Sequence, residues 1–93
     1  MSSSHIRTSL ETLASHFAAH PQDAASHDKP AIATLESGWR CNAAGPKGEL
    51  LVTDMPKAIG GDGTAPTPGW FLRATLANCD ATVIAMRAAQ LNV

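Results

Sequence analysis

The feature that most constrains this chain is an uninterrupted, alanine-rich stretch over residues 68–91. Thr67 followed by Pro68 predicts a helix start, because a threonine side chain caps free backbone amides and proline fits the first helical position. At about 100° per residue, the apolar side chains gather in one sector of that helix. Its members are Leu72, Leu76, Cys79, Val83 and Met86.

A narrow charged stripe of Arg73, Asp80 and Arg87 lies beside this sector, and alanine dominates much of the remaining surface. A helix with so little charge is typical of one surrounded by protein, so we expect a central, buried helix. A chain of 93 residues has little else with which to cover it. We therefore expect association with a second copy of the chain.

The N-terminal part, residues 1–30, is expected to form a helical extension and a linker. Thr8 and Glu11 fit a capping box, which predicts an amphipathic helix over residues 9–19 that ends before Pro21. Residues 22–30 are polar and are expected to form a loop.

Residues 31–93 are expected to hold a β-hairpin, a Gly/Pro-rich loop and the long helix. Residues 31–36 alternate in polarity, and we expect that strand to continue through residues 38–42 after a kink at Gly38. Residues 45–48 form a turn sequence, and residues 49–53 are the return strand. The predicted fold class is α+β.

Composition excludes several classes of function. The formal net charge of −1 argues against nucleic acid as a partner, because such proteins carry a basic patch. No apolar stretch reaches the roughly 20 residues that span a bilayer, and residues 1–10 lack the apolar region of a secretory signal. We expect a cytoplasmic protein without membrane association.

The two cysteines, Cys41 and Cys79, are expected to be free thiols. Cys79 lies in the apolar sector, where it is either a packing residue or a nucleophile. A nucleophile would need a nearby cation to stabilise its thiolate, and Arg40 and Arg73 are the candidates. Cys41 shares a strand face with Trp39, which favours a packing role.

No metal or cofactor site is expected. His16 and His20 are four residues apart on the first predicted helix but have no carboxylate beside them, so a solvated helix face is the simpler interpretation. The glycines of residues 60–69 lack both the GxGxxG spacing and the lysine of a phosphate-binding loop.

Three segments together resemble the OsmC/Ohr family of osmotically inducible and organic-hydroperoxide-resistance proteins. They are Asp54-Met55-Pro56, the loop from Gly60-Gly61 to Pro68, and Leu72 to Cys79 at the start of the long helix. The resemblance covers residues 31–93, and the chain is interpreted as the N-terminal half of such a domain. It implies an intertwined homodimer with central helices packed under curved sheets.

The resemblance also implies a function, thiol-dependent reduction of organic hydroperoxides in stress defence, with an external thiol as reductant. Cys79 falls on the peroxidatic position, and Arg40 matches the family's arginine loosely. Gly69 stands where the family has a glutamate, and the second cysteine belongs to a C-terminal half that these residues do not include. The alternative is a non-catalytic module that binds an apolar ligand or only dimerises, with Cys79 as a core residue.

Overall fold

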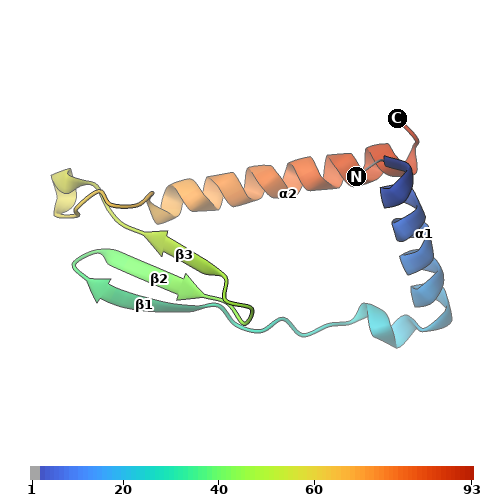
Figure 1. The fold of residues 1–93 in the computed structure, drawn as a ribbon, viewed down its shortest axis with the longest axis horizontal. Helices are drawn as coiled ribbons and strands as arrows, with labels where there is room; N and C mark the ends of the chain where they lie inside the picture. Colours follow the sequence, from blue (N-terminus) through green and yellow to red (C-terminus); the bar gives the residue numbers. More distant parts are fainter. Residues whose placement is uncertain (1–2) are drawn as a thin grey trace. The chain divides into compact units, whose positions relative to one another are not determined.

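The computed structural model describes residues 3–93 and confirms a mixed α+β architecture (Figure 1). In chain order the elements are α1 (Ser3–Ala19), the short 3-10 helix η1 (Pro21–Ala24), strands β1 (Ile32–Ser37), β2 (Arg40–Ala44) and β3 (Leu50–Thr53), the 3-10 helix η2 (Lys57–Ile59), and α2 (Pro68–Gln90). They belong to two compact units. Residues 3–27 and Leu76–Val93 form unit 1, and Asp28–Thr75 form unit 2.

Helix α1 of unit 1 ends at Ala19 as predicted, but it begins at Ser3 rather than at residue 9. The predicted capping box is wrong because Thr8 lies inside the helix. Its Oγ1 donates to the carbonyl oxygen of Ser4 at 2.9 Å, and Thr12 donates to Thr8 in the same way at 2.9 Å. A threonine inside a helix can bond its hydroxyl to the carbonyl oxygen one turn earlier. The spacing of Thr8 and Glu11 does not distinguish this arrangement from a cap.

The sheet of unit 2 is antiparallel, with the strands in the order β1-β2-β3. The prediction of one strand that continues past Gly38 is wrong, because the chain reverses there and residues 31–42 form two strands. Gly38 has a φ of +55°, a left-handed conformation that glycine adopts without strain, and the pairing shifts between Leu35 and Ser37. The glycine therefore makes a turn instead of a kink.

The second hairpin, between β2 and β3, is confirmed. The Gly45 amide donates to the Glu49 carbonyl oxygen at 2.8 Å and closes the loop, and Gly48 supplies a left-handed residue with a φ of +84°. The register pairs Cys41 with Thr53 and Ala44 with Leu50.

Helix α2 begins at Pro68, as the sequence predicts, and extends to Gln90. The Thr67 hydroxyl accepts a hydrogen bond from the Trp70 amide at 3.2 Å, which is the expected N-cap contact. After Gln90, Asn92 takes a left-handed conformation with a φ of 59°, and the Val93 amide donates to the Ala88 carbonyl oxygen at 3.0 Å. This geometry satisfies carbonyls that a helix end leaves free.

The expectation that α2 is buried is not met within the chain. Leu72 is 63% exposed, Leu76 58% and Val83 58%. Ala89 is the one buried apolar residue among residues 3–93. The apolar sector of α2 therefore has no cover in the single chain, because one sheet and one amphipathic helix supply too little apolar surface.

No helix in the described part of the chain combines the length and apolar character that crossing a membrane requires.

Candidate functional site

Cys79 lies midway along α2 and carries a free, exposed thiol. Its neighbours at helical spacing are Leu76, Val83 and Met86, all of them exposed. A thiol in this setting is open to a small-molecule oxidant in the single chain. The same surroundings would make it a packing residue once another surface covered the helix.

Arg40 begins β2, and its guanidinium is bonded inside unit 2. Its Nε donates to Glu36 Oε2 at 2.8 Å, and its Nη1 donates to Thr64 Oγ1 at 2.6 Å. Cys79 belongs to unit 1. The structure therefore does not bring the two residues together within one compact unit.

Cys41 is half-buried in β2, opposite Leu35 on one side and Thr53 on the other. Trp39 lies outside both flanking strands, in the turn between them. Its indole Nε1 donates to the carbonyl oxygen of Ile59 at 2.8 Å. The packing role predicted for Cys41 fits its half-buried place in the sheet, whereas Trp39 contacts the loop after β3.

His16 lies in α1, whereas His20 directly follows the last helical residue; both are exposed, and their ring centroids are 4.9 Å apart. The absence of a neighbouring carboxylate was wrongly inferred, because η1 folds back and places Asp23 Oδ2 2.8 Å from His16 Nε2. Even so, no group of three or more His, Cys, Asp or Glu side chains in residues 3–93 is arranged to hold a metal ion.

Sequence reasoning did not identify the polar network around Asp54. This side chain directly follows β3 and is only 1% exposed. Its carboxylate accepts hydrogen bonds from the Met55 amide at 2.7 Å and from the amide and hydroxyl of Thr64 at 3.1 and 2.7 Å. The Thr64 hydroxyl and the two amides hold the pKa of Asp54 below its ordinary value, because all of them stabilise the carboxylate.

A second carboxylate joins the same network from β1. Glu36 Oε1 accepts a hydrogen bond from Asn42 Nδ2 at 2.7 Å, while its Oε2 receives Arg40 Nε. The Asn42 hydrogen bond, followed by that of Arg40, lowers the pKa of Glu36. The signal for this pair was available in the sequence, because Glu36 and Arg40 flank the glycine turn, but the kinked-strand interpretation placed them on one strand.

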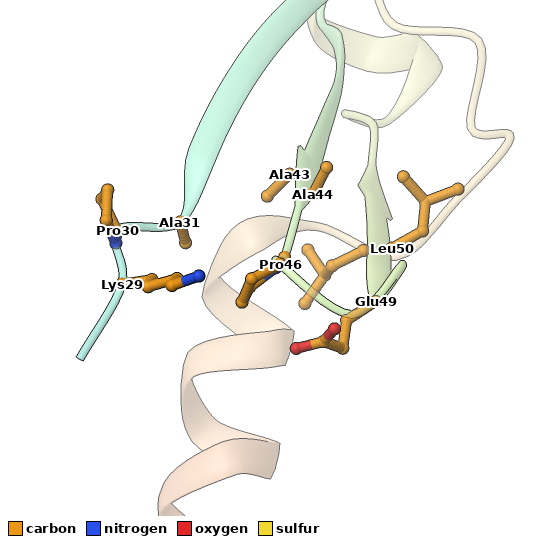
Figure 2. A pocket seen from close by; sticks show the side chains of 10 residues that line it. Lys29, Pro30, Ala31, Ala43, Ala44, Pro46, Glu49 and Leu50 are labelled. Carbon is orange, nitrogen blue, oxygen red and sulfur yellow. The ribbon is translucent and has the colours of Figure 1, made fainter.

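A shallow groove of about 450 Å³ lies at the other end of the sheet, beside the 45–48 turn (Figure 2). Its walls are mainly apolar, with Ala31, Ala43 and Leu50 among them, and Lys29 and Glu49 are the charged residues of its lining. Neither Cys79 nor Arg40 lines it.

Comparisons of the chain with protein-family models, with curated proteins and with solved structures find no match.

The Cys79 thiol and the Asp54 network differ in what they can do chemically. An accessible thiol on α2 can act as a nucleophile or redox centre when it ionises. The Asp54 network, in contrast, has both of its carboxylates and its guanidinium engaged with protein partners, which is typical of a structural role.

Proposed function

We propose that this chain is an OsmC-like stress-defence protein that reduces organic hydroperoxides through Cys79. The observation that carries the proposal is the free, exposed thiol of Cys79 on α2. It lies on the helix that follows the Gly/Pro loop, in the segment on which the resemblance to the OsmC/Ohr family is based.

The reaction needs only the thiol, a hydroperoxide and an external dithiol. The Cys79 thiolate attacks the terminal oxygen of R–O–O–H, an S–O bond forms, and the O–O bond breaks. The cysteine is oxidised to the sulfenic acid, and the alkoxide leaving group takes up a proton to give the alcohol. A dithiol then reduces the sulfenic acid, releasing water and returning the thiol while the dithiol becomes a disulfide.

Arg40 enters the proposal as the cation that stabilises the Cys79 thiolate, the role that the resemblance implies. A guanidinium keeps its charge at all physiological pH values and lowers the free energy of a nearby thiolate. An Arg40→Gln variant should therefore slow alkylation of Cys79 by iodoacetamide. Equal alkylation rates would remove Arg40 from the site.

A homodimer is part of the same proposal. The exposed apolar residues of α2 are those that the sequence predicts to be buried, and Leu72, Leu76 and Val83 are each more than half exposed. A second copy of the chain could cover this face with its own α2 face. The same residues would then lie on both sides of a two-fold interface.

The deciding experiment is the consumption of an organic hydroperoxide with a dithiol reductant by the wild type, Cys79→Ser and Cys41→Ser. We expect turnover to disappear in Cys79→Ser, because serine forms no thiolate, and to persist in Cys41→Ser. Turnover that survives in Cys79→Ser would refute the assignment of the nucleophile.

The second candidate function is a non-catalytic OsmC-like module in which Cys79 packs in the dimer interface. The specific observation in its favour is the position of Cys79 among exposed apolar side chains. In that case Cys79 should be alkylated only after the dimer dissociates, and no variant should consume hydroperoxide.

A further inference from the structure

The loop of residues 54–67, which joins β3 to α2, is closed by a buried carboxylate. Asp54 is 1% exposed and bonds to Thr64, ten residues further along the chain, through both the amide and the hydroxyl. A buried carboxylate is costly unless its oxygens are satisfied, so these bonds determine where the far side of the loop can lie.

The Thr64 hydroxyl has a defined orientation. It lies 2.7 Å from Asp54 Oδ2 and 2.6 Å from Arg40 Nη1. A guanidinium cannot accept a hydrogen bond, so Arg40 donates to Thr64 and the single hydroxyl proton points to Asp54. Both hydrogen bonds of this hydroxyl therefore involve a charged group, which makes them stronger than neutral ones.

Side chains of the sheet hold the Arg40 guanidinium in turn. Glu36 of β1 accepts from Arg40 Nε at 2.8 Å, and Asn42 of β2 occupies the other Glu36 oxygen at 2.7 Å. The chain of contacts thus runs from β1 through Arg40 and Thr64 to Asp54 at the end of β3.

We propose that Asp54, Thr64 and Arg40 form a latch that holds the 54–67 loop against the end of the sheet. The Thr64 hydroxyl is the link on which the latch depends, because among residues 3–93 it is the group that bonds to both Asp54 and Arg40. When the latch opens, the loop detaches locally while the three strands stay paired. The latch rests on hydrogen bonds within unit 2 and needs no peroxide chemistry, although it engages the same Arg40 that the proposed function assigns to the Cys79 thiolate.

The latch also supports the backbone hydrogen bonds within the loop between β3 and α2. The Asp54 amide donates to the Pro66 carbonyl oxygen at 3.2 Å, and Gly63 donates to Met55 at 3.1 Å, both inside the segment that the latch closes. Release of Thr64 should therefore expose the Gly63 amide together with its own.

The test is amide hydrogen exchange on the full 93-residue chain, comparing wild type with Thr64→Val and Thr64→Ser. Valine keeps the shape of threonine without the hydroxyl, and serine keeps the hydroxyl. We expect the protection of the residue-64 and Gly63 amides to fall by at least about tenfold in Thr64→Val, because valine loses both charge-assisted hydrogen bonds of the hydroxyl, and by less than about threefold in Thr64→Ser. The strand amides of β2 and β3 should keep their protection, because the opening is local.

Equal protection in Thr64→Val and Thr64→Ser would overturn the latch, and so would parallel loss in the strands. Arg40→Gln provides a second readout that does not need Thr64→Val to fold, and it should also lower the protection of the Thr64 amide. In the double variant Arg40→Gln, Thr64→Val the two effects should not add, because both break the same link. Simple additivity, or unchanged protection in Arg40→Gln, would exclude Arg40 from the latch.

Discussion

Gly61 lies where the 54–67 loop folds back onto its own beginning. Its amide donates to the Pro56 carbonyl oxygen at 3.0 Å, and a Cβ built on Gly61 would overlap the Met55 carbonyl oxygen. That oxygen also receives the Gly63 amide, so it cannot move without breaking a loop contact. The absence of a side chain at residue 61 is therefore a packing requirement of the loop.

Gly61→Ala should lower the free energy of unfolding by about 2 kcal/mol, because the backbone must shift to remove the overlap. Urea unfolding measures the change. Gly69→Ala is the matched control: its Cβ would meet Arg73 Nη1 at 3.6 Å, an ordinary contact, within the helical first turn. It should stabilise the chain by up to about 1 kcal/mol, so equal effects of the two variants would contradict the close approach.

The Asp54 carboxylate should make the stability of the folded chain depend on pH. Its pKa is lower in the folded chain than in the unfolded one, because the Thr64 hydroxyl and the Thr64 and Met55 amides stabilise the carboxylate. The stabilisation is therefore complete above the unfolded pKa and is lost as the pH falls through the lower, folded pKa.

Urea midpoints between pH 7 and pH 2 should decline on the acid side, with the decline beginning near the ordinary carboxyl pKa of about 4. Asp54→Asn should flatten that decline, and Asp28→Asn, at an exposed linker residue, should leave it unchanged. Glu36, whose pKa is lowered by Asn42 and Arg40, should account for part of what remains in Asp54→Asn. An unaltered acid-side decline in Asp54→Asn would be inconsistent with the hydrogen bonds described for this carboxylate.

At the level of elements, α2 depends on local contacts at its first turn. The Thr67 side chain caps the Trp70 amide at 3.2 Å, and the Thr67 carbonyl oxygen accepts from the Phe71 amide at 3.2 Å. Because α2 has few buried contacts within the chain, its capping contributes a large share of its stability.

Thr67→Ala should reduce the unfolding free energy by about 1 kcal/mol through loss of the cap, and circular dichroism during urea unfolding would report it. Thr82→Ala is the control inside the same helix, where the hydroxyl bonds to the Asn78 carbonyl oxygen at 2.8 Å. It should change stability by less than about 0.5 kcal/mol, since alanine has the higher helix propensity. A Thr82→Ala effect as large as that of Thr67→Ala would show that the cap stabilises α2 no more than a hydroxyl inside the helix does.

In the sheet, Gly38 divides the single predicted strand of residues 31–42 into β1 and β2. A glycine inside a β-like run is compatible with a bulge, a kink or a turn, and local patterning does not separate these outcomes. The turn prevails at Gly38 because reversal pairs β1 with β2 over most of their lengths, from Ile32 with Ala44 to Ser37 with Arg40. It also places Glu36 beside Arg40 and Asn42.

At the scale of the whole molecule, α2 leaves much of its apolar surface without cover from the rest of the chain. Trp70, Leu72, Leu76, Val83, Ile84 and Met86 are all large, apolar and exposed on this one helix. Contiguous exposed apolar surface is typical of protein interaction sites. The proposed homodimer is the assembly that would bury it.

Leu76→Asp tests the proposed dimer, because Leu76 is 58% exposed in the chain and the substitution acts on the assembly instead of the fold. An uncompensated charge in the interface should raise the dissociation constant at least about a hundredfold. Sedimentation equilibrium would measure it, together with circular dichroism to verify that α2 remains.

Asn78→Asp introduces the same charge on the opposite side of α2 and should leave the dimer intact. A wild-type chain that sediments as a monomer, or a Leu76→Asp dimer of unchanged affinity, would contradict the interface.

Sequence patterns alone predict the features that depend on neighbours a few residues apart. The start of α2 at Pro68, its extent, the end of α1 at Ala19 and the turn of residues 45–48 all follow from capping, proline and glycine chemistry acting over one or two turns of chain. The resemblance to the OsmC/Ohr family and the choice of Cys79 also belong to the sequence, and they remain proposals for the experiments above.

The contacts between residues far apart in the sequence are visible only in the three-dimensional fold. It divided residues 31–42 into two strands, brought Asp23 to His16, and joined Arg40 to Thr64 across 24 residues and Asp54 to Thr64 across ten. It also left the apolar sector of α2 exposed, although the pattern alone predicts burial. Local preferences specify which side chains a helix presents, whereas burial depends on whether the rest of the chain supplies enough apolar surface to cover them.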